Sequence, residues 1–166
     1  MTIAAPLPPT AVQPITTAPI ETHRMARISF RQPVSSSGAI DAAWWPRSLD
    51  LVQELPELLD VVWTAGREIT RVTYHIAAWQ QPVPRRMTVQ HRTVRLGGFA
   101  TSDPRTVRLS DAWGQERIDV LVVPPASEPA VAERALNLAS LAHSALTANE
   151  ILAQATNPST DDSIPT

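Results

Sequence analysis

The sequence has 166 residues and contains neither cysteine nor lysine. Without cysteine, disulfides, thiolate zinc sites, iron–sulfur clusters and a cysteine nucleophile are excluded. Without lysine, a Schiff base and the lysine of a P-loop are excluded. All fourteen basic residues are arginines, whose planar and permanently charged guanidinium groups suit carboxylates and phosphates. The absence of cysteine fits a reducing compartment, so we expect a cytoplasmic protein.

Long apolar runs and motifs that specify a reaction are missing as well. No stretch approaches the roughly 18 apolar residues of a membrane span, and the first nine residues do not resemble a signal peptide. The four histidines, at positions 23, 75, 91 and 143, lack the spacing of metal ligands. No glycine-rich nucleotide loop and no nucleophile elbow occurs. We therefore expect no membrane partner, no metal, no cofactor and no catalytic residue that a motif would identify.

Proline and small polar residues gather at both ends of the chain. Residues 1–23 are rich in proline, threonine and alanine, and residues 156–166 have a similar polar composition. Such segments bury too little apolar surface to offset the entropy of ordering, so we expect two disordered tails. The remaining residues, 24–155, are predicted to form one domain.

Charge is unevenly distributed along the chain, although the net charge is only −2. Residues 61–108 contain eight arginines against Glu68 and Asp103, whereas residues 118–166 contain six acids against Arg134. Two interpretations stay open: a basic sheet covered by an acidic helix of the same chain, or a face that binds anions.

The hydrophobic pattern predicts an α+β domain. Alternating or apolar runs predict five strands, and a leucine-rich stripe predicts a helical segment over residues 49–65, which Pro56 should kink or divide. A second stripe predicts a long C-terminal helix over residues 128–152. The expected fold is a mostly antiparallel sheet of about five strands with both helical segments packed on one face. The strands are expected at residues 26–31, 68–79, 86–96, 105–110 and 117–123.

The most unusual segment is Gly38–Ser48, which contains two adjacent tryptophans between an acid and an arginine. In one interpretation Trp44 or Trp45 stacks on a planar ligand, Arg47 holds an anionic group and Asp41 supplies a polar contact. In the other, one tryptophan belongs to the core and the other shields the helix that follows, while Asp41 pairs with Arg47 or caps a turn. Large aromatic residues belong to cores more often than to binding sites.

A second candidate site lies on the predicted sheet. If residues 68–79 and 86–96 form a hairpin, His75 faces His91 and Arg71 faces Arg95 on one surface. Such a surface could bind an anion or transfer protons near neutral pH. The alternative is that these side chains form a solvated outer face without function. The site also depends on the assumed register, since a slip of one residue would move either set to the other face.

The Gly38–Ser48 segment and several later pieces resemble a family of actinobacterial proteins of unknown function, which is marked by a G-x-x-D-x-x-W-W-P-R-S block. The resemblance covers about residues 25–140. It implies a bacterial source and supplies no activity, cofactor or partner. The later pieces are Arg71–Tyr74, Trp79, Pro84–Arg86, Val94–Phe99 and Leu121–Pro125.

These observations predict a small non-enzymatic binding module that takes a protein partner or a small anionic ligand. One alternative is an anion-binding enzyme that uses His75 or His91 beside Arg71 and Arg95. Another is an RNA-contacting accessory protein, against which the negative net charge and the missing RNA-binding motifs argue. The oligomeric state stays open.

Overall fold

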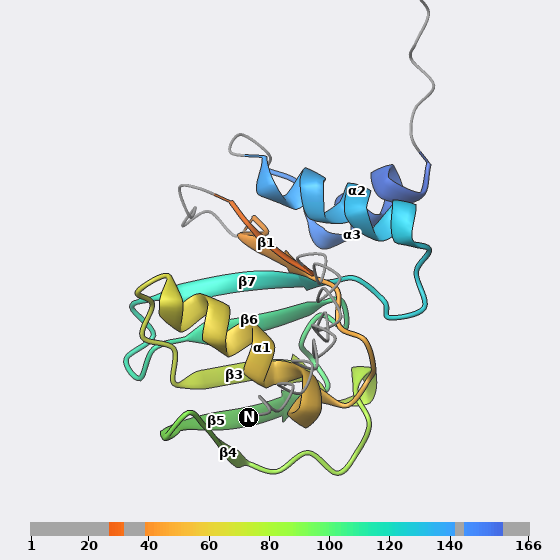
Figure 1. Cartoon of the computed structure of the whole chain (residues 1–166). Coiled ribbons are helices and arrows are strands. Elements are labelled where there is room, and N and C mark those ends of the chain that lie inside the picture. The colour runs from red at the N-terminus through yellow and green to blue at the C-terminus, as the bar shows by residue number, and fades with distance from the viewer. Residues whose placement is uncertain (1–26, 32–38, 142–144, 158–166) are drawn as a thin grey trace, which may run out of the picture.

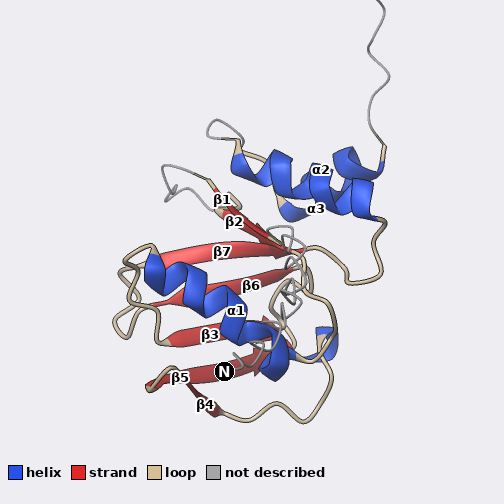
Figure 2. Ribbon diagram, in the orientation of Figure 1, coloured by secondary structure: helices blue, strands red, loops and turns tan. Residues whose placement is uncertain are grey.

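The structure, a computed structural model, describes residues 27–31, 39–141 and 145–157, and it combines a seven-stranded sheet with three α-helices (Figures 1 and 2). The predicted tails, 1–23 and 156–166, lie outside the described residues except for Thr156 and Asn157. Within the described part, no helix is long and apolar enough to cross a membrane. The elements in chain order are β1 (Ile28–Phe30), β2 (Ala42–Trp44), α1 (Leu51–Thr64), β3 (Arg71–His75), the 3-10 turn η1 (Ile76–Ala78), β4 (Arg86–Val89), β5 (Arg92–Phe99), β6 (Thr106–Ser110), β7 (Arg117–Val122), α2 (Pro129–Ser140) and α3 (Ala148–Thr156).

The strands form one mixed sheet in the order β1-β2-β7-β6-β3-β5-β4. The pairs β2–β7 and β3–β5 are parallel, and the other four neighbouring pairs are antiparallel. The α+β class is therefore confirmed, but the expectation of about five mostly antiparallel strands is too simple. The path from β2 through α1 to β3 is a crossover that skips β7 and β6.

Two features account for the difference between five expected and seven observed strands. β2 lies inside the tryptophan segment and is only three residues long, too short to show an alternating pattern. The predicted strand 86–96 is a hairpin, in which Gln90 and His91 form the turn with φ angles of +48° and +66°. Two consecutive positive φ angles are typical of a two-residue hairpin turn. Met87 and Val89 before the turn differ in parity from Val94 and Leu96 after it because the turn separates two strands, and Gly97 and Gly98 are part of β5.

Helix α1 covers one face of the sheet (Figure 1). Asp50 caps it by accepting the backbone N–H groups of Val52 and Gln53, at 3.1 and 3.2 Å. Pro56 lies inside the helix without ending it, so the expected division at this residue is wrong. Because the helix continues, an unbroken apolar stripe packs on strands β3, β5, β6 and β7. The buried apolar residues of α1 are Leu51, Leu55, Leu58, Leu59 and Val62.

Helices α2 and α3 form a second core at the β1–β2–β7 end of the sheet. The long C-terminal helix of the sequence prediction is two helices, because α2 ends at Ser140 and a new capping box begins at Thr147. In that box Thr147 and Glu150 satisfy each other's backbone N–H groups. The exchanged hydrogen bonds lower the pKa of the Glu150 carboxyl.

The two cores lie on opposite faces of the sheet, since successive strand residues point to opposite sides. Val120 and Val122 of β7 belong to the α1 core, whereas Leu121 belongs to the α2–α3 core. Because α2 and α3 pack at the β1–β2–β7 end, no helix of the described part of the chain covers the sheet face opposite α1 over β6, β3, β5 and β4. Both helical layers were expected on one face, and this expectation is wrong. We call the uncovered surface of these four strands the open face.

The adjacent glycines of β5 provide a test of this two-sided arrangement. A Cβ atom at Gly98 would lie 2.9 Å from the ring of Tyr74, which is buried in the α1 core, whereas a Cβ at Gly97 would lie 3.1 Å from the exposed ring of Phe99. We expect Gly98→Ala to lower the free energy of unfolding by about 1–3 kcal/mol, as overpacking does. Gly97→Ala should change it by less than about 1 kcal/mol, because the Phe99 ring can move. Urea unfolding of both variants measures the difference, and equal losses would contradict the assignment of faces.

Candidate functional site

The two tryptophans of the Gly38–Ser48 segment lie inside the fold. Trp44 is 1% exposed and stacks on Trp79, with ring centroids 5.5 Å apart. Trp45 is 8% exposed, and the Arg27 guanidinium lies 4.1 Å from the centroid of its ring. Both predicted stacking residues therefore already have protein partners. This burial supports the core interpretation, since neither ring presents a free face to a ligand. Two of its details are wrong, because Trp45 packs with α2 and α3 instead of shielding α1, and Asp41 pairs with Arg31 instead of Arg47.

Asp41 links three neighbouring strands of the sheet. It is 2% exposed, and its carboxylate forms an ion pair with Arg31 at 3.3 Å. The same carboxylate accepts the backbone N–H of Asp119 at 3.1 Å, while the backbone N–H of Asp41 donates to the Asp119 carbonyl at 2.9 Å. A buried ion pair of this kind is costly to break, because its removal leaves an uncompensated charge. Asp41 therefore joins the β1–β2 pair to β7 and offers no surface to a ligand.

Arg47 lies at the surface and is held by α1. Its guanidinium donates to Glu57 at 2.5 Å, and its backbone N–H donates to Glu54 at 3.0 Å. The hydrogen bond to Glu57 raises the pKa of Arg47. Ser48 also donates to Glu54, at 2.9 Å, so this part of the segment anchors the entry to α1.

The structure separates the two histidines that the sequence placed together. His75 ends β3 and lies opposite Phe99, whereas His91 is in the β4–β5 turn at the other end of β5. The expectation that they face each other is wrong because β3 and β5 are parallel, and an antiparallel hairpin was assumed. The Nδ1 atom of His75 accepts the backbone N–H of Ala77 at 3.1 Å, which starts the 3-10 turn.

The predicted proximity of Arg71 and Arg95 is observed, and a third arginine joins them. Arg71 lies opposite Arg95 in the β3–β5 pair, and Arg95 lies opposite Arg86 in the β4–β5 pair. We call these three exposed residues the arginine row. With Thr70, Thr93 and Ala112 they line an open depression of about 330 Å³. In the described part of the chain, no carboxylate lies within ion-pair distance of any of the three guanidinium groups.

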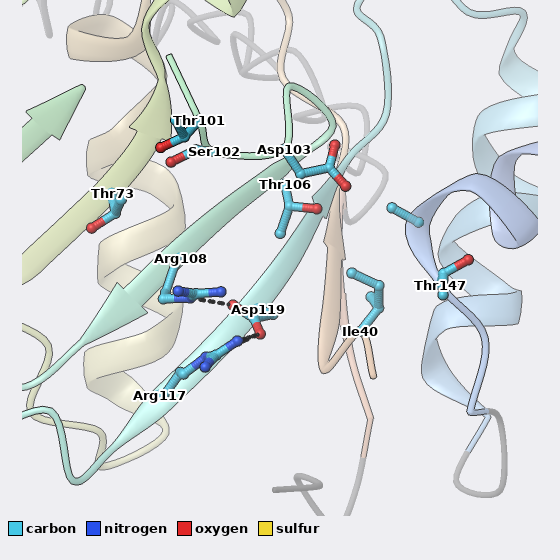
Figure 3. A pocket seen from close by; sticks show the side chains of 11 residues that line it. Ile40, Thr73, Thr101, Ser102, Asp103, Thr106, Arg108, Arg117, Asp119 and Thr147 are labelled. Atoms are coloured by element: carbon cyan, nitrogen blue, oxygen red, sulfur yellow. Dashed lines mark hydrogen bonds and ion pairs between the residues drawn. The ribbon is translucent and has the colours of Figure 1, made fainter. Parts of the chain in front are cut away.

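A second depression, of about 430 Å³, lies beside the row on the same face (Figure 3). Here Arg108 and Arg117 both point to Asp119, which accepts from them at 2.8 and 2.6 Å. The hydrogen bond to Asp119 raises the pKa of Arg117. Two guanidinium groups share one carboxylate, so each has an anionic partner although one positive charge is left over. The remaining lining of the depression is mostly polar and includes Thr73, Thr101, Ser102, Asp103, Thr106 and Thr147.

Like charges directly opposite each other destabilise a sheet unless an anion lies between them. Five other described arginines have a carboxylate partner, namely Arg31, Arg47, Arg67, Arg108 and Arg117. Four more contact a tryptophan ring, an amide or a backbone carbonyl, namely Arg27, Arg92, Arg105 and Arg134. The arginine row is distinguished because three guanidinium groups without such a partner among the described residues lie opposite one another on neighbouring strands. Sequence reasoning missed Arg86 as a site residue because its place depends on the β4–β5 turn. The sequence did contain a signal for Arg86: it alternates with the apolar residues Met87 and Val89, which places it with Thr88 on the face away from the core. In the described residues, no group of three or more histidine and acidic side chains could hold a metal.

The chain belongs to a family of unknown function, DUF5994, which residues 27–139 match. This range includes the whole sheet, α1 and nearly all of α2, and it agrees with the resemblance to proteins of unknown function. No curated protein and no solved structure matches the chain.

A pair of substitutions separates core from surface in the tryptophan segment. Trp44→Ala should lower the free energy of unfolding by about 3–5 kcal/mol, because it removes a fully buried ring and its stack on Trp79. Arg47→Ala should cost only about 1 kcal/mol or less, because its ion pair is partly exposed. Chemical unfolding followed by circular dichroism measures both. A loss for Arg47→Ala as large as that for Trp44→Ala would contradict this assignment.

Proposed function

We propose that the protein is a non-enzymatic binding module that holds an anionic ligand on the open face of its sheet. The arginine row carries this proposal: Arg71, Arg86 and Arg95 lie on three neighbouring strands with no carboxylate partner in the described part of the chain. Binding an anion would remove the repulsion that the sheet imposes on them. A cytoplasmic location and an actinobacterial source are part of the proposal and rest on the sequence alone.

The chemistry of the row favours a ligand with several negative groups. Each guanidinium presents a planar fork of donors that fits carboxylate or phosphate oxygens in two parallel hydrogen bonds. Neighbouring strands lie roughly 4.8 Å apart, so the three residues span about 10 Å across the sheet. This breadth exceeds one phosphate group. The hydroxyls of Thr70 and Thr93, which line the same depression, could donate further hydrogen bonds.

A binding role fits the geometry better than catalysis. The enzyme alternative depended on His75 and His91 acting beside Arg71 and Arg95, and the parallel pairing of β3 and β5 puts the two imidazoles at opposite ends of β5. General acid–base catalysis needs its groups within hydrogen-bond reach of the same reacting atoms. His75 and His91 therefore cannot act together beside the arginine row, whereas anion binding requires only the guanidinium groups of the row.

The direct test is isothermal titration of the full chain with sodium tripolyphosphate at low salt. We expect binding by the unmodified protein and a roughly tenfold to hundredfold loss in Arg95→Gln, the size expected for hydrogen bonds to charged groups. Arg92→Gln is the matched control. It removes the same charge from the same strand, but its guanidinium lies on the α1 side, 5.0 Å from the centroid of the Trp63 ring.

Equal weakening in Arg95→Gln and Arg92→Gln would show only a general charge effect and would contradict a site at the arginine row. Absence of tripolyphosphate binding by the unmodified protein at low salt would contradict the anion-binding function itself. Thermal unfolding of each variant verifies that the fold is retained.

A further inference from the structure

Phe99 is an unusual residue on the open face because its ring is largely uncovered. The side chain is at the end of β5, and the residue is 54% exposed. Two ring carbons lie 3.1 and 3.7 Å from the place where a Cβ at Gly97 would be, so the ring rests beside this glycine. Gly97 and Arg95 have the same parity as Phe99, which puts the ring on the same surface as the arginine row.

A second exposed aromatic residue, Trp113, follows β6 on the side of the arginine row away from Phe99. Ser110 pairs with Arg71, and Trp113 follows in the turn between β6 and β7. Trp113 is 86% exposed, and it comes directly after Ala112, which lines the arginine depression. A single exposed aromatic residue is common on a protein surface, so Phe99 is of interest because it lies on the same surface as the arginine row.

No large side chain of β5 stands between the arginine row and Phe99. Thr73 and Gly97 lie opposite each other in the β3–β5 pair, one step along from Arg71 and Arg95. Glycine has no side chain there, so nothing on β5 separates the guanidinium groups from the ring. Arg95 and Phe99 are four residues apart, or roughly 13 Å along a strand. Cations and a stacking surface are thus presented side by side on one open sheet.

We propose that the open face binds single-stranded nucleic acid, with phosphates on the arginine row and a base stacked on Phe99. This inference rests on the proposed anion-binding function and names its ligand. Arginines interleaved with exposed aromatic rings are the composition of surfaces that bind single strands without base-specific readout. The 10 Å breadth of the row engages consecutive phosphates of a strand, which a mononucleotide with one phosphate cannot supply.

In the sequence, the net charge of −2 argued against binding of nucleic acid. In the structure, however, acidic and basic residues lie on different parts of the surface. Glu128, Glu133 and Glu150 lie on or next to α2 and α3, in the layer that covers the other end of the sheet. Near the open face, Asp119 is already shared by two arginines. Asp103 lines the second depression and Asp111 follows Ser110, but neither carboxylate lies within ion-pair distance of the arginine row. The three guanidinium groups therefore present a local positive charge although the whole chain is slightly acidic.

Fluorescence anisotropy of the full chain with a labelled ten-nucleotide oligo-uridine tests this inference. We expect Phe99→Leu, which keeps an apolar side chain but removes the ring, to weaken oligo-uridine binding roughly tenfold. Phe99→Tyr should restore it, and tripolyphosphate binding should be unchanged in both variants. Arg95→Gln should weaken binding and reduce the slope of log affinity against log salt by about 0.7, the value for one phosphate contact on a single strand. Arg92→Gln again serves as the control.

The possible failures are distinguishable. If tripolyphosphate binds at the row but oligo-uridine does not respond to Phe99→Leu, the single-strand inference is wrong and the anion-binding function stands. Uridine monophosphate or a glutamate decapeptide binding as tightly as the oligonucleotide would also overturn the inference, in favour of a free nucleotide or an acidic protein. If neither tripolyphosphate nor oligo-uridine binds, both the inference and the proposed function fail.

Discussion

The alternation of side chains in β2 is the constraint on which the rest of this structure depends. Trp44 is the last residue of β2 and Trp45 follows it directly, and the two rings point to opposite faces, so Trp44 enters the α1 core and Trp45 enters the α2–α3 core. Each has a specific partner there, the Trp79 ring for one and the Arg27 guanidinium for the other. Large rings contribute heavily to core stability, so this dipeptide secures two layers of helices at once. A segment that resembles a binding site in the sequence is therefore the place where both cores meet the sheet.

That arrangement also determines where function can reside. The α1 layer covers one face of β6, β3, β5 and β4, while α2 and α3 are held at the β1–β2–β7 end by contacts with Trp45, Leu121 and Val123. No described helix covers the other face of the four strands, so the residues on it belong to neither core. Three arginines in cross-strand register are an energetic cost on such a surface. Their persistence without a carboxylate partner in the described chain distinguishes them from the paired arginines, whose role is to hold elements together.

The sequence predicted those features that depend on local pattern. The alternation of Val72 and Tyr74 against Arg71 and Thr73 marked β3, and the leucine stripe marked α1. Features that depend on long-range pairing were missed, because strand order and direction are not encoded in periodicity. The Arg71–Arg95 neighbourhood emerged correctly from an incorrect antiparallel hairpin, whereas the His75–His91 pair came from the same hairpin and is wrong. An error in strand pairing changes which side chains are predicted to lie together, because one misplaced turn moves the side chains of a whole strand.

The most direct measurement is chemical-shift mapping of the isotope-labelled protein by NMR during titration with oligo-uridine. If the open face is the binding surface, the perturbed backbone N–H signals will cluster on β3, β5 and β4, with the largest changes near Arg71, Arg95 and Gly97. The signals of α1 and of the α2–α3 layer will remain in place. Perturbations that cluster instead on either helical layer, or that are spread evenly over the molecule, would contradict a functional role for the open face.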